Sequence, residues 1–198
     1  MDESLFKVVN RFAERTGWLH PPAVAYAKYG IVLFGVALLA GWWIGRQRSN
    51  TAIAAAVACT VVAVFVALGA AQVLGHLVDR SRPYDAIDGV RVLVARTTDF
   101  SFPSDHATVA GAVAGGLWFA GRRLGRAVIG LAIVMAFARV YVGAHYPGDV
   151  LAGLVLGAAV AVAVNRLTVR RVTALADRLV RSPLGPFVAR SGDEFERA

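Results

Sequence analysis

Residues 101–108 read Ser-Phe-Pro-Ser-Asp-His-Ala-Thr and lie between a polar loop and a long apolar run. Pro103 ends the extended segment, and Ser104 is a residue type that is favoured as the N-cap of a following helix. Asp105 and His106 then fall in the first helical turn, where free backbone N–H groups and the helix dipole favour a bound anion. The stretch therefore predicts an anion site at the start of a helix, with a histidine that could bind or protonate a phosphate oxygen.

Long apolar blocks on both sides of this stretch indicate a membrane protein. The 198-residue chain is 57% hydrophobic and only 17% charged, whereas about a quarter of the residues in an ordinary soluble domain are charged. A transmembrane helix needs roughly 20 predominantly apolar residues. We therefore predict an all-α membrane bundle of about five transmembrane helices, at residues 24–44, 51–74, 104–120, 127–142 and 149–164.

Polar segments flank the predicted transmembrane domain, which covers residues 21–166. Residues 1–20 include an amphipathic pattern, which predicts an N-terminal helix that lies on the membrane interface or packs against the bundle. Residues 167–198 read as a polar C-terminal tail. The net charge is +8, but the arginines cluster at the ends of apolar blocks and no basic stripe alternates with aromatic residues. This pattern is typical of membrane proteins, and we expect no nucleic-acid partner.

The arginine distribution also predicts the orientation of the chain in a cell membrane. The segments 45–50 and 121–126 and the residues after 164 are rich in arginine and carry almost no acidic residues. The positive-inside rule assigns such segments to the cytoplasm. The N-terminus, the loop 75–103 and the turn 143–148 would then lie on the outer face of a multi-pass membrane protein.

This topology brings five polar residues from distant segments to one end of the bundle. Asp149 follows His145 by four positions and could orient its imidazole as a nucleophile, while His106 could protonate a leaving oxygen. Arg82 and Arg139 could hold phosphate oxygens through forked hydrogen bonds. Each residue alone has an ordinary structural explanation, so the joint arrangement carries the prediction. It suits phosphoryl transfer through a phosphohistidine, and we expect no metal and no cofactor.

At these residues the chain resembles the type 2 phosphatidic acid phosphatase (PAP2) superfamily, whose fold is shared with vanadium haloperoxidases. The family signatures are Lys-x6-Arg-Pro, Pro-Ser-Gly-His and Ser-Arg-x5-His-x3-Asp. Here the first ends in Arg-Pro at 82–83, the second reads Pro-Ser-Asp-His at 103–106, and the third runs from 138 to 149. The resemblance implies that His145 is the nucleophile, His106 the general acid and Asp149 the orienting residue. It also implies a set of phosphate-binding residues, namely Arg82, Ser104, Asp105 and Arg139.

Three departures from the signatures resemble one branch, the bacitracin-resistance-type undecaprenyl pyrophosphate phosphatases. Gly75 replaces the signature lysine, Asp105 replaces glycine and Ala138 replaces serine. That branch carries Pro-Ser-Asp-His and lacks the lysine of the first signature. Candidates to replace the lysine are His76, Arg80 and Arg96.

The resemblance implies a lipid phosphatase that converts a polyprenyl diphosphate to the monophosphate at the outer face, as in recycling of a cell-wall carrier lipid. Phosphatidic acid, phosphatidylglycerol phosphate or a polyprenyl phosphosugar is an alternative substrate for the same chemistry. A non-catalytic protein that binds or transports lipids is an alternative from another class. Haloperoxidases are soluble, and the long apolar blocks argue against that activity. The sequence makes no prediction about oligomeric state.

Overall fold

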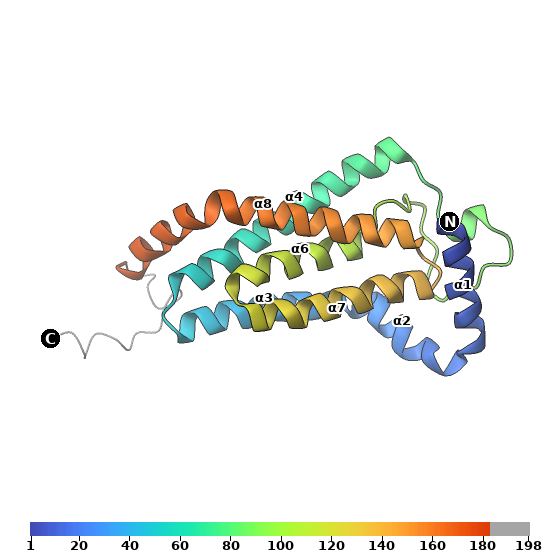
Figure 1. Ribbon diagram of the computed structural model, residues 1–198, viewed down its shortest axis with the longest axis horizontal. Coiled ribbons are helices and arrows are strands. Elements are labelled where there is room, and N and C mark those ends of the chain that lie inside the picture. The colour runs from blue at the N-terminus through green and yellow to red at the C-terminus, as the bar shows by residue number, and fades with distance from the viewer. Residues whose placement is uncertain (183–198) are drawn as a thin grey trace.

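The computed structural model describes residues 1–182 as an elongated bundle of helices, with no strand in that part of the chain (Figure 1). The last part of the predicted tail, 183–198, lies outside the described residues. Chain order gives α1 (Asp2–Arg15), η1 (Gly17–Leu19), α2 (His20–Tyr29), α3 (Ile31–Gln47), α4 (Thr51–Val78), α5 (Pro83–Ala86), α6 (Asp105–Ala120), α7 (Arg122–Tyr141) and α8 (Pro147–Val180). The all-α membrane fold predicted from the sequence is confirmed.

The number of helices that can cross a membrane differs from the predicted five. By length and composition, α4, α7 and α8 qualify among the described residues, and α2 with α3 adds a fourth if this bent pair counts as one span. Helix α6 has 16 residues, so it is about 24 Å long at ~1.5 Å per residue, shorter than a hydrocarbon core of about 30 Å. By that test three or four helices qualify rather than five, although α6 still runs from one end of the bundle to the other.

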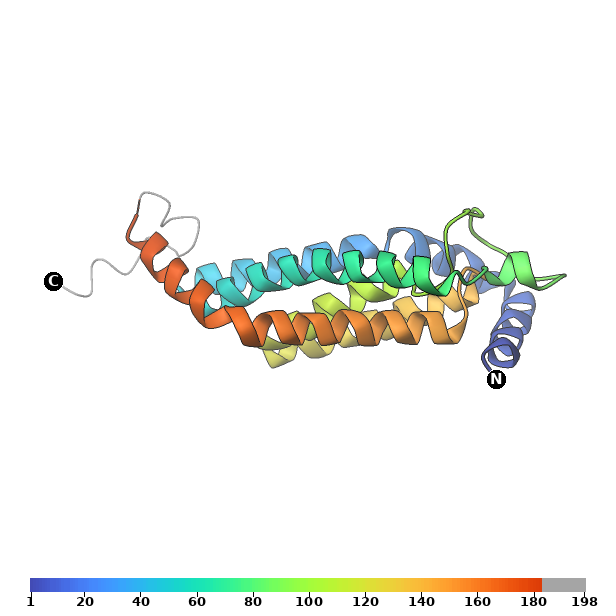
Figure 2. The same ribbon diagram turned by 90° about the horizontal axis from the view of Figure 1, so that it is seen from above.

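Helix α6 is short but enclosed, because it packs against α4, α7 and α8. Glycines permit this close approach: a methyl group built at Gly157 would collide with the carbonyl oxygen of Thr108, and one built at Gly111 would collide with that of Leu154. Figures 1 and 2 show α4 and α8 side by side along the bundle. The helix that carries the Pro-Ser-Asp-His segment is thus the centre of the bundle.

The predicted first span, 24–44, is broken at Gly30, where α2 and α3 meet at a bend of 56°. Two hydrogen bonds hold α2 against α7. The Tyr26 hydroxyl donates to the Leu131 carbonyl oxygen at 2.8 Å, and Arg139 Nη1 donates to the Ala27 carbonyl oxygen at 3.2 Å. The bend therefore brings the C-terminal end of α2 beside Arg139.

Helix α1 lies across the end of the bundle (Figure 1). Its buried Phe6 meets the ring of Tyr146 edge-to-face, with centroids 5.5 Å apart, and Asn10 exchanges two hydrogen bonds with the backbone of Arg91. The apolar side chains of Leu5 and Val8 are exposed. Packing against the bundle is thus observed, and contact of the other face with the membrane interface stays a prediction.

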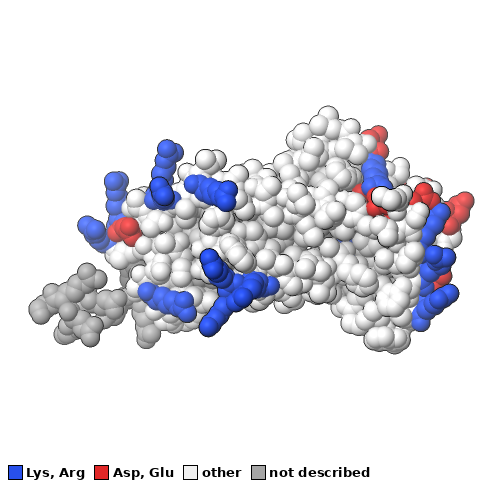
Figure 3. Space-filling model, in the orientation of Figure 1, with Lys and Arg blue, Asp and Glu red and all other residues white. Residues whose placement is uncertain are grey.

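Helix α8 runs on to Val180, so the predicted boundary between residues 166 and 167 falls inside one continuous helix. Charged side chains gather at the two ends of the bundle, and the middle of the visible face is uncharged (Figure 3). The α3–α4 turn, the α6–α7 turn and the second half of α8 share one end, and the N-terminus, the 79–104 loop and the α7–α8 turn share the other (Figure 1).

Candidate active site

A cavity of about 520 Å³ opens at the end of the bundle that holds the N-terminus. Its walls come from α2, α4, α6, α7, the 79–104 loop and the α7–α8 turn. The cavity brings together five of the predicted site residues, which are Arg82, Asp105, His106, Arg139 and His145. Ser104 and Asp149 are fully buried behind this wall.

The turn between α7 and α8 presents His145, whose side chain is only 3% exposed, to the cavity. Its Nδ1 lies 2.8 Å from the Ser101 carbonyl oxygen. Because a carbonyl oxygen can only accept a hydrogen bond, Nδ1 carries the proton and Nε2 is unprotonated, with a lone pair that accepts from the neighbouring arginines. Burial lowers the pKa of His145 well below its ordinary value, and the charges of Arg139 and Arg82 lower it further. The residue is therefore a neutral imidazole with a nucleophilic nitrogen facing the cavity.

Two guanidinium groups flank this nitrogen. Arg139 Nη2 lies 3.3 Å from His145 Nε2, and Arg82 Nη1 lies 3.4 Å from it. Arg139 Nε is buried without a hydrogen-bond partner among the described residues. A phosphate whose oxygens bound both guanidiniums would place its phosphorus atom beside Nε2.

Arg82 is held in place by the backbone and by a carboxylate. Its Nη1 donates to the Ala144 carbonyl oxygen at 3.1 Å, its Nε to the Asp99 carbonyl oxygen at 3.1 Å, and its Nη2 to Asp99 Oδ1 at 2.9 Å. Burial would raise the pKa of Asp99, but a hydrogen bond from Thr97 and the charge of Arg82 hold it below its ordinary value. Asp99 is thus an ionised counterion that the sequence did not single out.

The Pro-Ser-Asp-His segment opens α6 as predicted. Asp105 accepts hydrogen bonds from Gln72 Nε2 of α4, at 3.2 Å to each carboxylate oxygen. His106 lies one position further, partly buried, and lines the cavity. Ser104 occupies the N-cap position but makes no side-chain cap, and its buried hydroxyl has no hydrogen-bond partner among the described residues.

Asp149 does not bond to the imidazole, contrary to the expectation from the four-residue spacing. His145 Nδ1 and Asp149 Oδ2 are 4.0 Å apart, beyond hydrogen-bond reach. Asp149 Oδ2 instead accepts from the Ser101 hydroxyl at 2.5 Å and from the Tyr146 backbone N–H at 2.9 Å. Ser101 therefore connects the two residues: its hydroxyl donates to the Asp149 carboxylate, and its carbonyl oxygen accepts from the imidazole of His145.

The structure also shows why Gly75 stands where the family has lysine. A Cβ atom at this position would lie 3.2 Å from the Phe102 carbonyl oxygen and 3.4 Å from the Phe100 ring. The 100–102 segment thus packs directly on α4. A side chain at position 75 would therefore require that segment, which leads into α6, to shift by a few tenths of an ångström.

None of the three predicted substitutes for the lysine lines the cavity. His76 meets the Phe100 ring edge-to-face, Arg96 lies over the Tyr84 ring, and Arg80 bonds to two carboxylates. Lys28 lines the cavity instead. It comes from the last turn of α2 and follows Ala27, whose carbonyl oxygen accepts a hydrogen bond from Arg139. Nothing in the local sequence marks this residue, because its position depends on the bend at Gly30.

Comparisons with known proteins show the family of this chain. The PAP2 superfamily model matches residues 53–173. Undecaprenyl-diphosphatase BcrC of Bacillus subtilis is 30% identical, over 79% of this chain and 78% of that protein. Decaprenylphosphoryl-5-phosphoribose phosphatase of Mycobacterium tuberculosis is 36% identical, over 66% of this chain and 68% of that protein.

The solved structure of Aquifex aeolicus LpxE has the same fold, with a TM-score of 0.66 at 21% identity, covering 82% of this chain and 93% of that one. The matched family segment begins in α4 and ends in α8, and it therefore contains all three groups of site residues. From the family model, the similarity to its relatives and the shared fold, we conclude that this chain belongs to the PAP2 superfamily.

Proposed function

We propose that this protein removes the terminal phosphate of a polyprenyl diphosphate at the outer face of the cell membrane. The products would be a polyprenyl monophosphate and inorganic phosphate. One observation carries the proposal: an unprotonated imidazole nitrogen lies between two guanidinium groups at the wall of a cavity in a membrane bundle. The similarity to a protein named undecaprenyl-diphosphatase supports the choice of lipid.

In the first step, the terminal phosphate binds to Arg82 and Arg139, and His145 Nε2 attacks its phosphorus atom. A P–N bond forms and the P–O bond to the lipid monophosphate breaks, with its electron pair going to the leaving oxygen. His106, protonated as the imidazolium in the complex with the anionic substrate, gives its proton to that oxygen. The other ring proton stays on Nδ1 and is donated in the hydrogen bond to the Ser101 carbonyl oxygen. That hydrogen bond stabilises the positive charge that develops on the ring.

In the second step, water attacks the phosphohistidine and gives a proton to His106. The P–N bond breaks, its electron pair returns to Nε2, and inorganic phosphate leaves. His145 and His106 are then restored to their starting protonation states. The two arginines stabilise the charge on the phosphoryl oxygens in both steps.

The charges around the cavity suit a diphosphate. Apart from histidines, Lys28, Arg82 and Arg139 are the basic residues that line it in the described part of the chain. Two arginines can hold the terminal phosphate, and Lys28 is available for the second one. The 100–102 segment adds apolar wall for the start of the lipid tail through Phe100 and Phe102.

The arginine-rich turns support an outward-facing site. The segments 45–50 and 121–126 and the second half of α8 lie at the end of the bundle opposite the cavity. If these segments face the cytoplasm, as the positive-inside rule predicts, the cavity opens on the other side, where a diphosphate released during export of cell-wall precursors would be found.

A polyprenyl phosphosugar is the second candidate substrate. The observation that favours it is the 36% identity to decaprenylphosphoryl-5-phosphoribose phosphatase. The same residues would act on the sugar phosphate, with a sugar hydroxyl rather than a lipid phosphate as the leaving group. The other phosphate of that substrate, which joins the lipid to the ribose, would be separated from the reacting phosphate by the sugar.

Phosphate release by the purified protein in detergent with EDTA tests the proposal. The substrates are undecaprenyl diphosphate, decaprenylphosphoryl-5-phosphoribose, phosphatidic acid and phosphatidylglycerol phosphate, with His145→Ala as the control variant. We expect the diphosphate to be hydrolysed fastest and the variant to be inactive. A preference for another substrate would overturn the choice of lipid. A fully active His145→Ala variant would overturn the mechanism, and no release from any substrate would point to a lipid-binding role.

A further inference from the structure

We propose that Asp2 and Arg80 form a positioning relay that couples helix α1 to the nucleophile through Asp149 and Ser101. The inference rests on the proposed role of His145. The relay gives the N-terminal helix a part in catalysis, although no residue of α1 lines the cavity.

The first link is a buried ion pair between Arg80 and Asp149. Arg80 Nη1 lies 2.7 Å from Asp149 Oδ1, and the Asp149 side chain has no solvent exposure. The guanidinium also lies over the Tyr146 ring, 3.9 Å from its centroid. Because an unpaired buried carboxylate is strongly unfavourable, Arg80 stabilises the ionised Asp149 together with the Ser101 hydroxyl and the Tyr146 backbone N–H.

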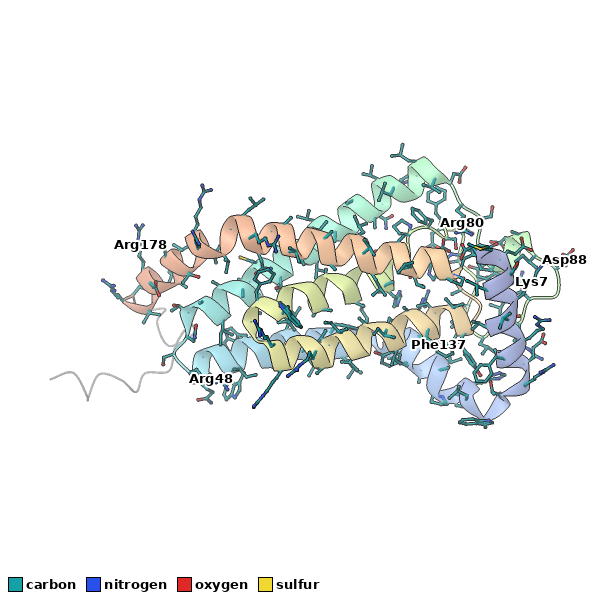
Figure 4. The ribbon with its side chains drawn as sticks, viewed as in Figure 1. Lys7, Arg48, Arg80, Asp88, Phe137 and Arg178 are labelled. Carbon is teal, nitrogen blue, oxygen red and sulfur yellow. The ribbon has the colours of Figure 1, made fainter. Side chains whose placement is uncertain are left out.

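The second link holds Arg80 from the other side. Its Nη2 lies 2.7 Å from Asp2 Oδ2, while Asp2 Oδ1 accepts a hydrogen bond of 2.7 Å from the Gly148 backbone N–H. Asp2 therefore bridges Arg80 and the first turn of α8. Figure 4 shows Arg80 where the start of α1 meets the start of α8.

The third link reaches the nucleophile. The Asp149 carboxylate accepts from the Ser101 hydroxyl, and the Ser101 carbonyl accepts from His145 Nδ1. The backbone is tied as well, because the Ser101 N–H donates to the Arg80 carbonyl oxygen at 2.8 Å. Arg80 is thus linked to the Ser101 side chain through Asp149, and to the Ser101 main chain through its own carbonyl oxygen. If Asp2 is lost, Arg80 can turn toward solvent, and the Ser101 carbonyl loses part of its support.

The chain contains a matched control for this relay. Glu3 follows Asp2 on the same helix and pairs with Lys7 at 2.6 Å, with both side chains more than half exposed. Glu3→Gln and Asp2→Asn both remove one negative charge from the first turn of α1. Only Asp2→Asn also alters the contacts with Arg80 and α8. Any effect of the first-turn charge on the helix itself is therefore common to both variants.

The test is steady-state hydrolysis of the diphosphate by protein tagged at the C-terminus, with thermal unfolding in detergent as a check on folding. A misplaced nucleophile slows the chemical step, so we expect Asp2→Asn to lower kcat about tenfold with KM within about twofold. Asp2→Glu should recover most of the loss, and Glu3→Gln should match the wild type. Equal kcat values for Asp2→Asn and Glu3→Gln, or a change confined to KM, would overturn the relay.

A double-mutant cycle separates a relay from independent contributions. Arg80→Gln should lower kcat about 100-fold, and Asp2→Asn should add little to it, because Asp2 acts through Arg80. Additive losses would contradict the inference. An inactive wild type, or an active His145→Ala variant, would instead contradict the proposed function, so the two failures can be told apart.

Discussion

The two ends of the bundle use arginine in opposite ways. At the site end, Arg80, Arg82 and Arg139 are each held by carboxylates, carbonyl oxygens or the imidazole. At the far end, arginines of the α6–α7 turn such as Arg122 and Arg123 are exposed. The difference teaches that burial and partners, rather than residue type, distinguish the arginines of the candidate site from those exposed at the opposite end.

The strongest test of this comparison removes one arginine from each end. Arg139→Gln should lower kcat/KM for the diphosphate by about 10²–10³-fold, because it removes a charged donor aimed at the phosphoryl oxygens. Arg123→Gln at the opposite end should change kcat/KM by no more than about twofold. The measurement is phosphate release in detergent, with thermal unfolding to confirm that both variants fold. Similar losses at both ends would remove the distinction between them.

A second test addresses how the imidazole is oriented. Asp149→Asn weakens the contacts to both Arg80 and Ser101, so we expect kcat to fall about 100-fold. Ser101→Ala keeps the carbonyl that accepts from His145 Nδ1 and should lower kcat only about tenfold. Single-turnover rates would show whether the chemical step is the one affected. If Ser101→Ala were harmless while Asp149→Asn remained damaging, Asp149 would act on His145 without the Ser101 hydroxyl, for example through the Tyr146 backbone N–H.

A third, smaller effect concerns Lys28, the lysine that lines the cavity and that we propose binds the second phosphate. Lys28→Met should raise KM for the diphosphate about fivefold, since one charge-assisted contact is lost at a partly solvated site. Hydrolysis of a phosphomonoester such as phosphatidic acid should hardly change. Lys7→Met, on α1 and outside the cavity, is the matched control. Equal effects on the two substrates would rule out binding of the second phosphate by Lys28.

The smallest expected effect is a shift in the titration of His145. Because burial and the charges of Arg139 and Arg82 lower its pKa, the imidazole should stay neutral as the pH falls through 6.5, the ordinary value for histidine. Nitrogen NMR of histidine-labelled protein, assigned with His145→Ala, would follow this directly. In Arg82→Gln one positive charge is gone, so the midpoint should move up toward the ordinary value. A wild-type midpoint at that value would contradict the buried neutral nucleophile.

Much of this site could be predicted because the chemistry requires charged and ionisable residues, which are rare inside a membrane. Arg139 and His145 stood out against apolar neighbours, and their order along the chain matched family signatures. Ser101 was part of the decisive stretch, yet its role stayed hidden because a backbone carbonyl has no signature in the sequence. The prediction of a direct contact between Asp149 and His145 was wrong for a related reason. A spacing of four positions aligns side chains only within a continuous helix, and α8 begins after His145.

By itself, the sequence determined the all-α membrane class, the positions of most helices and the identity of the main site residues. Those features follow from local properties, since a bilayer requires long apolar segments and phosphate chemistry requires particular side chains. Only the tertiary structure decided the bend at Gly30, the position of Lys28 in the cavity and the contact of Asp2 with Arg80. These depend on how helices distant in sequence pack against one another, and local periodicity carries no record of that packing.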